Sequence, residues 1–408
     1  MKRVVITGMA GISPIGCDWE TIEHNLRHGN TGIRYMPEWE MYKDLNTRLG
    51  APASSFVKPA HFNRKVTRSM GRVALMATVV AEQALEDSGL KDNPIIKDGR
   101  MGISFGSSTG SPDAIADFGQ MLLNHNSSSL NANSYLKMMS HTAAVNISVY
   151  LQLQGRTITT SSACTSGSQG IGYAYESIKF GQQKLMIAGG SEELCPTEAA
   201  VFDTLFATST KNDTPHKTPS PFDKNRDGLV IGEGAGALIL EEMEHAKERG
   251  AHIYAEIIGF GTNSDGSHVT QPQYETMQKA MELALTEANI DPQNIGYISA
   301  HGTATDKGDI AETKATYNLF GSTTPISAFK SYTGHTLGAC GALEAIVAIK
   351  MMEKGWFHGT ANLDSIDGEC ADLDYLTGAG RDIQTSFVMS NNFAFGGINT
   401  SLIFKKPE

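Results

Sequence analysis

The sequence lacks the features of membrane proteins and of general nucleic-acid binders. No stretch of its 408 residues approaches the ~18 consecutive apolar residues that a membrane-spanning helix requires. The opening run Met1–Ile6 is similar to the start of a signal peptide, but Thr7 and Gly8 end its apolar character too early. A net charge of −11 excludes a surface that attracts nucleic acid in general. We expect a soluble, cytoplasmic chain with no nucleic-acid partner and no membrane partner.

Cysteine is scarce, and its placement argues against two common stabilising devices. The chain has five cysteines, an odd number. They are scattered and show no metal-ligand spacing: Cys17, Cys164, Cys195, Cys340 and Cys370. We therefore expect neither a disulfide framework nor a zinc site, and we predict no metal. Because the chain is acidic overall, any acidic partner has to dock on a local basic patch.

The chain is longer than a single hydrophobic core usually supports, and parts of it recur. The helical pattern Ala81–Leu90 leads into a buried strand pattern at Gly102–Gly106. About 200 residues later, Met281–Ile290 leads in the same way into Gly296–Ala300. The agreement in order favours an internal duplication over coincidence.

A second pair of similar segments supports the duplication. Cys164–Gly181 and Gly338–Gly355 each open with small residues and continue as an amphipathic helix that ends at glycine. Helix–strand units of this kind are typical of α/β proteins with helix-covered sheets. We predict an α/β fold with two similar halves, residues 1–250 and residues 251–408.

Cys164 is the first candidate for chemistry. It lies between a Thr- and Ile-rich run, Gln154–Ser162, and a helical pattern over Ser166–Phe180. A thiol at such a corner faces the positive end of the helix dipole, which favours the thiolate. Small neighbours would let a substrate carbonyl approach the sulfur, as an acyl-accepting nucleophile requires. On the thiol alone, a buried structural cysteine is the stronger alternative.

Three downstream motifs change that balance. His301 follows the predicted strand that ends at Ala300, Lys330 and His335 follow the strand pattern Pro325–Phe329, and Asn391–Asn399 is a Gly-rich turn after a third strand. In open α/β sheets, ligands bind at the carboxyl ends of the strands. A lone histidine is more often structural. A cysteine, two histidines and a lysine that all follow strands form a more specific pattern.

At this point the chain resembles the β-ketoacyl-acyl-carrier-protein synthases, the condensing enzymes of fatty acid and polyketide synthesis. The matching segments are VVITGMAGISPIG, ACTSG, PFDKNRDGLVIGEGAGALILEE, HGTAT, KSYTGHTLGACGALEAI and NFAFGGIN. They span essentially the whole chain and resemble the elongating type, which has a Cys-His-His triad. The resemblance implies a thiolase-like fold whose two duplicated halves form an αβαβα five-layer arrangement. It also implies decarboxylative Claisen condensation of malonyl-carrier protein with a bound acyl chain, in fatty acid, polyketide or polyene elongation.

The resemblance assigns catalytic roles to named residues. Cys164 would accept the acyl chain, and the backbone N–H groups of Cys164 and Phe395 would form an oxyanion hole. His301 and His335, as neutral imidazoles, would bind the malonyl thioester oxygen and stabilise the enolate. The reaction would need no metal or organic cofactor, because the substrates arrive on the phosphopantetheine arm of acyl carrier protein.

Lys330 matches a family position that orients the histidine region, together with Glu344. A plain structural ion pair between these two residues is the alternative. One residue departs from the family pattern: the final motif has Ala394 where elongating synthases usually have glycine. We expect its Cβ to restrict the loop that gates the acyl tunnel.

Substrate contacts follow from the same resemblance. Thr303 and Thr305 match positions near the phosphopantetheine arm, although both residues could simply cap a turn. Phe202 and Phe393 would line the acyl tunnel, with plain core packing as the alternative. Thr109 stands where relatives often place a bulky aliphatic residue at the far end of the tunnel. Its small polar side chain suggests an oxygenated or conjugated chain.

The predicted carrier-protein dock is a basic run with helical spacing. Its residues are Arg64, Lys65, Arg68 and Arg72, with help from Lys211. Carrier proteins are acidic, whereas the alternative is a merely solvated helix face. The family implies a homodimer, with a heterodimer containing a chain-length factor as a variant. Two rival functions stay open: a non-catalytic partner subunit of the chain-length-factor kind, and a malonyl-carrier-protein decarboxylase.

Overall fold

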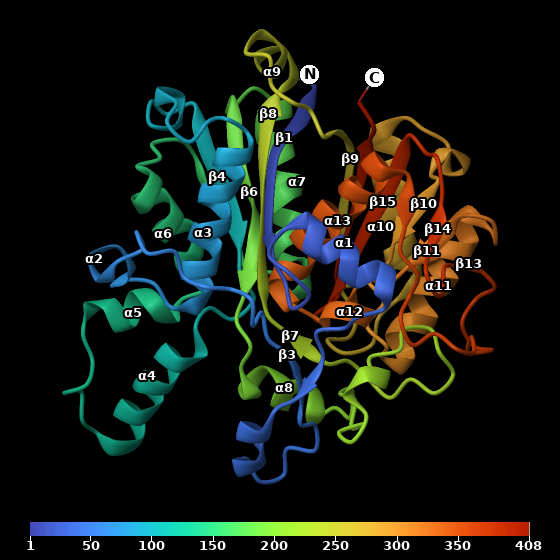
Figure 1. Cartoon of the computed structure of the whole chain (residues 1–408), viewed down its shortest axis with the longest axis horizontal. Helices are drawn as coiled ribbons and strands as arrows, with labels where there is room; N and C mark the ends of the chain where they lie inside the picture. Colours follow the sequence, from blue (N-terminus) through green and yellow to red (C-terminus); the bar gives the residue numbers. More distant parts are fainter. Residues whose placement is uncertain (408) are drawn as a thin grey trace.

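The computed structural model describes residues 1–407 and consists of two similar α/β halves (Figure 1). The main elements of the first half are β1 (Val4–Ile12), α3 (Arg72–Asp87), β4 (Met101–Gly106), α6 (Thr142–Leu151), β5 (Thr157–Thr160), α7 (Ser166–Lys179), β6 (Leu185–Glu192) and β8 (Gly234–Glu242). Those of the second half are β9 (Ala255–Ser264), α10 (Tyr274–Ala288), β10 (Tyr297–Ser299), α11 (Asp306–Phe320), β11 (Pro325–Ser327), α13 (Cys340–Lys354), β15 (Phe387–Ala394) and β16 (Ile398–Lys405).

The strand order repeats between the halves. The first set runs β5-β4-β6-β8-β1 and the second runs β11-β10-β15-β16-β9. In each set the first three strands are parallel and the last two pair antiparallel. The duplication predicted from the sequence is therefore present in the topology. The predicted boundary at residues 250 and 251 falls between α9 (Met243–Glu248) and β9.

A short pairing joins the two strand sets. Val4–Ile6 of β1 pairs antiparallel with Ala255–Ile257 of β9, so the strands form one continuous sheet. A two-residue strand, β13 (Asp374–Tyr375), extends the far edge beside β11. Strand β5 forms the opposite edge.

The helices complete a five-layer arrangement, as predicted. Helices α7 and α13 contact each other and lie between the two strand sets, where α13 packs against both β8 and β15 (Figure 1). Helices α3 and α6 cover the outer face of the first set, and α10 and α11 cover the second. Helix α13 is buried on almost every side, as a middle layer requires. At Gly167 of α7, an added Cβ would lie 2.9 Å from the backbone oxygen of Gly338.

The remaining helices and strands lie outside the two strand sets and the helices that cover them. The short helices are α1 (Trp19–His28), α2 (Arg64–Thr67), α4 (Pro112–Asn124), α5 (Ala132–Met138), α8 (Pro196–Asp203) and α12 (Lys330–Thr333). The short strands are β2 (Arg34–Tyr35), β3 (Leu49–Ala51), β7 (Ile231–Gly232), β12 (Trp356–Phe357) and β14 (Arg381–Asp382). Two 3-10 turns matter for the site: Ala163–Thr165 opens α7, and Leu337–Ala339 opens α13.

Candidate active site

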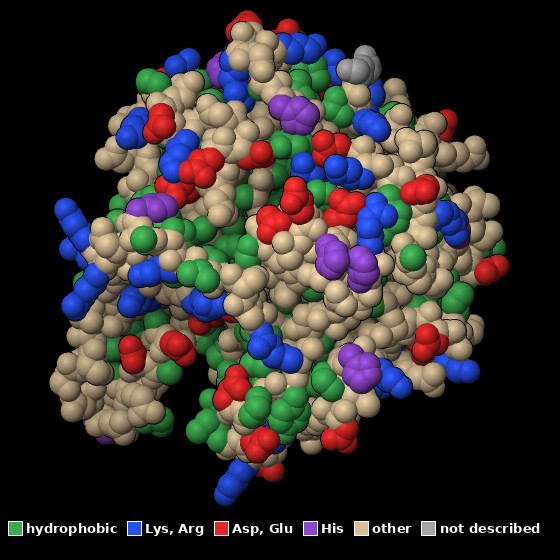
Figure 2. Space-filling view, viewed as in Figure 1, with side chains coloured by type: hydrophobic (Ala, Val, Ile, Leu, Met, Phe, Trp, Pro, Cys, Tyr) green, Lys and Arg blue, Asp and Glu red, His purple; other side chains and the backbone are tan. Residues whose placement is uncertain are grey.

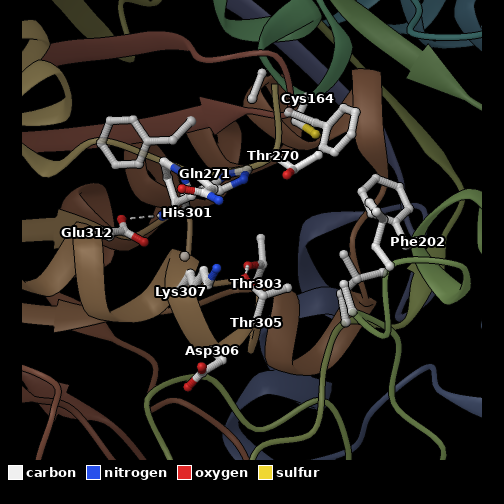
Figure 3. A pocket seen from close by; sticks show the side chains of 18 of the residues that line it. Cys164, Phe202, Thr270, Gln271, His301, Thr303, Thr305, Asp306, Lys307 and Glu312 are labelled. Carbon is white, nitrogen blue, oxygen red and sulfur yellow. Dashed lines mark hydrogen bonds between the residues drawn. The ribbon is translucent and has the colours of Figure 1, made fainter. Parts of the chain in front are cut away.

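The predicted motifs meet at the carboxyl ends of β5 in the first strand set and of the three parallel strands β10, β11 and β15 in the second. Cys164 follows β5, His301 follows β10, His335 follows β11 by way of α12, and Phe395 follows β15. All four residues line one cavity of about 480 Å³. Figure 3 shows Cys164 at one end of this cavity, with His301 and Phe202 on opposite sides. The sheet topology therefore brings together residues that are up to 231 positions apart, from Cys164 to Phe395.

Cys164 is held in a strained corner at the start of α7. The preceding residue, Ala163, has a φ of 50°, a left-handed conformation that is costly for a residue other than glycine. The Cys164 side chain is only 3% exposed. His335 Nε2 lies 3.0 Å from its sulfur, and the Cys340 thiol donates to the Cys164 carbonyl oxygen at 3.2 Å.

The sequence argument for a resting thiolate is wrong. Burial raises the pKa of Cys164 to about 11, although the backbone N–H of Phe395 and the Lys330 charge act in the opposite direction. Desolvation is the dominant effect, because the sulfur has almost no contact with solvent. Cys164 is a thiol in the free protein at neutral pH.

The tautomer of His335 follows from its backbone contact. The N–H of Leu337 donates to His335 Nδ1 at 3.2 Å, so Nδ1 acts as the acceptor. A neutral imidazole with an acceptor at Nδ1 carries its proton at Nε2. Leu337 makes this contact from a left-handed conformation with a φ of 44°. The Nε2–H of His335 therefore points at the Cys164 sulfur as a donor.

Lys330 sets the tautomer of His301 in a similar way. Its ammonium contacts the Glu344 carboxylate, the His301 carbonyl oxygen at 2.6 Å and His301 Nδ1 at 3.1 Å. An ammonium has three protons, and each has one of these acceptors. His301 Nδ1 is thus an acceptor, so its proton is at Nε2. Both histidines carry their proton on the nitrogen that is left to act on a substrate.

The charge on Lys330 persists despite complete burial. Burial lowers its pKa, but the Glu344 carboxylate more than offsets this, so the net pKa of Lys330 is raised. Glu344 also accepts from Asn392 Nδ2 at 2.7 Å, which anchors the pair to β15. The Lys330 and Glu344 side chains are 2% and 1% exposed, so the pair lies fully inside the protein.

The two histidines stay neutral for electrostatic reasons. Burial and the positive charge of Lys330 lower the pKa of His301 and of His335 well below the usual value. The two rings meet edge to face, with centroids 5.2 Å apart. The resemblance implied neutral imidazoles, and these environments favour that state over the whole physiological pH range.

Two carboxylates that the sequence argument missed hold the loop that carries His301. Glu312 accepts from the backbone N–H groups of His301 and Gly302, each at 2.7 Å. Asp309 accepts from the N–H groups of Thr303 and Ala304. Both carboxylates come from α11, which begins just after the loop. Their spacing in the sequence resembles an ordinary helix surface, so no pattern singled them out.

Four of the five predicted substrate-binding residues line the cavity, and Thr109 does not. Thr303 and Thr305 line the cavity and their hydroxyls lie 2.9 Å apart. Phe202 and Phe393 also line it: Phe202 packs edge-on against Phe395, and Phe393 packs edge-on against His301. Thr109 does not reach this cavity. It lies instead beside the buried carboxylate of Glu192, which accepts from its backbone N–H at 3.2 Å.

Ala394 is accommodated without strain. It is the last residue of β15 and pairs with Ile398 in extended backbone, where any residue is allowed. The conformational freedom of glycine is used by the next residues, Gly396 and Gly397, which have φ values of 92° and 77°. The backbone at position 394 therefore does not need glycine.

The predicted docking residues do not share one helix. Helix α2 begins after the cap residue Asn63 and ends at Thr67, and α3 begins only at Arg72 after Gly71. The guanidinium of Arg72 makes two hydrogen bonds to the buried carboxylate of Glu233, so it is already paired within the protein. Arg64, Lys65 and Arg68 remain exposed. Figure 2 shows Lys and Arg side chains gathered around the place of α2.

Lys211 belongs to a different part of the surface. Its ammonium donates to the carbonyl oxygen of Asn225 at 2.8 Å and lies 3.5 Å from an oxygen of Asp227. Both partners belong to the segment just before β7. Lys211 therefore stabilises its own loop, and its charge is partly neutralised there.

The three central side chains also have the geometry of a metal site. The ligand atoms of Cys164, His301 and His335 all lie within 4.8 Å of one another. The Lys330 ammonium, 3.1 Å from His301 Nδ1, opposes the binding of a second cation. Absence of a metal from the reaction stays a prediction.

Comparison with known proteins agrees with this geometry. Residues 1–246 match the model of the β-ketoacyl synthase N-terminal domain, and residues 254–364 match that of the C-terminal domain. The chain belongs to the β-ketoacyl synthase family. The resemblance inferred from the sequence is confirmed, and with it the acyltransferase class of the enzyme and the thiolase-like fold. No helix within residues 1–407 combines the length and the apolar character needed to cross a bilayer.

Individual relatives match along the whole chain. The chain is 37% identical to 3-oxoacyl-[acyl-carrier-protein] synthase 1 of Haemophilus influenzae, over 100% of this chain and 99% of that protein. A crystal structure of a β-ketoacyl synthase from Burkholderia phymatum has a TM-score of 0.99 at 56% identity, with full coverage of both chains. The ishigamide ketosynthase/chain length factor has a TM-score of 0.90 at 28% identity, also with full coverage.

The raised pKa of Cys164 predicts its reactivity. Alkylation of Cys164 by iodoacetamide, followed by peptide mass spectrometry, should accelerate about tenfold per pH unit between about pH 6 and about pH 9, because the thiolate fraction rises throughout. The unfolded chain in denaturant serves as the control, since its thiol has an ordinary pKa. A rate that levels off below about pH 8 would show that Cys164 is already a thiolate.

The buried Lys330–Glu344 pair predicts a stability pattern. Lys330→Met leaves the Glu344 carboxylate buried without its partner and should lower the free energy of unfolding by about 3–5 kcal/mol. The double variant Lys330→Met/Glu344→Met should recover most of that loss. The matched control is Lys279→Met, which breaks an exposed pair with Glu282 and should cost about 0–1 kcal/mol. Equal losses in Lys330→Met and in the control, measured by denaturant unfolding, would contradict this account.

Proposed function

We propose that this chain is a 3-oxoacyl-acyl-carrier-protein synthase that condenses malonyl-carrier protein with an acyl chain held on Cys164. The observation that carries the proposal is the pair of neutral imidazoles, His301 and His335, which both carry their proton on Nε2 beside one buried thiol, with the Nε2–H of His335 directed at its sulfur. Such donors bind a thioester oxygen and its enolate without taking up a proton. Full-length similarity to a synthase of this name supports the same reaction.

In the first half-reaction, the sulfur of Cys164 attacks the acyl thioester carbonyl. The backbone N–H groups of Cys164 and Phe395, which both act on the sulfur, would bind the oxyanion of the tetrahedral intermediate. The His335 Nε2–H stabilises the thiolate as it forms. A carbon–sulfur bond forms to Cys164, and the carrier's carbon–sulfur bond breaks. The thiol proton leaves with the released phosphopantetheine sulfur.

In the second half-reaction, malonyl-carrier protein enters the same cavity. Its thioester oxygen accepts from His301 and His335, and loss of carbon dioxide leaves an enolate that these donors stabilise. The enolate carbon attacks the acyl-Cys164 carbonyl, and the Cys164 sulfur departs and takes a proton from solvent. Thr303 and Thr305 line the cavity and would contact the phosphopantetheine arm. The atoms balance without an oxidant or reductant, so we propose that no organic cofactor takes part.

The proposed partner is acyl carrier protein, docked on the exposed residues Arg64, Lys65 and Arg68. An acidic carrier would be attracted to this local basic patch on an otherwise negative chain. We also propose a homodimer that pairs through β5, because this strand forms an open edge of the sheet. The similarity to a ketosynthase/chain length factor structure keeps a heterodimer as the second candidate. The intact Cys-His-His set favours the catalytic subunit of such a pair.

A malonyl-carrier-protein decarboxylase would use the same two histidines, so the half-reactions have to be measured separately. Cys164→Ala should abolish acyl transfer, seen as a lost acyl adduct by intact mass spectrometry, and should retain carbon dioxide release. His301→Ala should retain the Cys164 adduct and lower carbon dioxide release about 100-fold or more, since it removes one enolate donor. Wild-type protein that releases carbon dioxide from malonyl-carrier protein but never forms a β-ketoacyl product would instead be a decarboxylase.

The docking proposal predicts a salt-dependent effect of charge reversal. Arg68→Glu should weaken carrier-protein binding about tenfold at low salt and less at high salt, because exposed charges are screened. Lys97→Glu, an equivalent reversal at another exposed lysine, is the matched control and should leave the affinity unchanged. Unchanged affinity of Arg68→Glu at low salt, measured by titration calorimetry, removes this face from the dock.

A further inference from the structure

Glu198 is a buried carboxyl with no partner. It lies on α8, and its side chain is 5% exposed. Neither of its two carboxyl oxygens has a hydrogen-bond partner within residues 1–407. Buried polar groups in proteins are almost always paired, so an unpaired carboxyl at this depth needs an explanation.

The neighbouring carboxyls do have hydrogen-bond partners, so the lack of partners is specific to Glu198. Glu192 accepts from the Ser107 hydroxyl and from the N–H groups of Ser108, Thr109 and Gly338. Glu193 accepts from the Ser111 hydroxyl and the Val73 N–H. These two carboxyls are satisfied by the protein itself. Only Glu198 in this cluster keeps its full hydrogen-bonding capacity.

The environment keeps Glu198 uncharged. Burial raises its pKa well above the usual value, and the nearby carboxylates of Glu192 and Glu193 raise it further. A neutral carboxyl group has one O–H donor and a free acceptor oxygen. Such a group is complementary to a hydroxyl, which also donates one hydrogen bond and accepts others.

The two half-reactions require a space for the acyl chain that is separate from the open cavity. The malonyl arm occupies the open cavity while the acyl chain is still bound to Cys164, so the two cannot share the same space. Figure 3 shows His301 on one side of the cavity and Phe202 on the other. Ala199 of α8 and Cys164 belong to one apolar cluster, which also contains Leu337 and against which Phe202 packs.

Helix geometry links this apolar space to Glu198. Phe202 and Glu198 are four residues apart on α8 and therefore share one face of the helix. The Thr109 side chain, on the loop after β4, lies close enough to the Glu198 carboxyl to lower its pKa, although no hydrogen bond of ordinary geometry joins the two groups. Phe202 lines the cavity that contains Cys164, whereas Glu198 and Thr109 do not, so an acyl chain would reach these two residues only past the Phe202 ring.

We propose that Glu198 is the specificity residue at the far end of the acyl pocket and that it selects chains with a hydroxyl group at their distal end. This inference rests on the proposed condensing function and adds the class of acyl chain. In the free protein the carboxyl is unpaired, and the distal hydroxyl of the bound chain supplies its partner. A chain that ends in methyl leaves the carboxyl unsatisfied and is rejected.

The test compares matched acyl-carrier-protein thioesters over a series of chain lengths, each made with a terminal methyl and with a terminal hydroxyl. The rate of Cys164 acylation is measured by intact mass spectrometry in wild type, Glu198→Gln and Glu198→Met. Wild type and Glu198→Gln should favour the hydroxyl chain at the optimal length by about tenfold or more. Glu198→Met should reverse the preference. Its thermal midpoint without substrate should equal or exceed that of wild type, because an unpaired buried carboxyl is removed.

The outcomes separate this inference from the proposed function. Normal acylation with the same hydroxyl preference in wild type and Glu198→Met, or with no preference at any length, overturns the role of Glu198 and leaves the condensing function intact. A lower thermal midpoint or a changed oligomeric state in Glu198→Met shows a structural partner for the carboxyl and also overturns it. Absence of acylation by every donor in every variant overturns both.

Discussion

The site depends on one buried ammonium group. Lys330 donates its three protons to Glu344, to the His301 carbonyl oxygen and to His301 Nδ1. The contact ties the loop after β10 to α12 and α13, and through Asn392 to β15. The Lys330–Glu344 ion pair therefore holds together the loop after β10, the helices after β11, and β15. It also decides which nitrogen of His301 carries the proton that acts on a substrate.

The same charge explains the electrostatics of the cavity. Burial and the nearby ammonium hold both imidazoles neutral, while burial holds the Cys164 sulfur as a thiol. The resting site thus places the positive end of a buried ion pair behind neutral donors. This arrangement stabilises negative charge that develops on a substrate oxygen and costs little reorganisation, because the donors are already oriented. Catalysis in this account comes from fixed donors rather than from a resting thiolate or an imidazolium.

Much of this could be predicted from the sequence, and the failures have physical reasons. Motifs after short strands located Cys164, His301 and His335, because the carboxyl ends of parallel strands converge. The resting thiolate was mispredicted because burial, which no local pattern reveals, raises the pKa of the Cys164 thiol. The basic run was assigned to one helix because its spacing is helical, whereas Asn63 and Gly71 divide it into two segments. Glu312 and Glu198 were missed because the partners of a buried carboxyl are set only by tertiary packing.

The most direct test of the central claim is to locate the protons on the two histidines. Neutron diffraction from crystals of the deuterated protein would show them at each ring nitrogen. The account predicts neutral His301 and His335, each with its proton on Nε2, and an ammonium at Lys330 with three protons. A proton on Nδ1 of either ring, or a doubly protonated imidazolium, would contradict it.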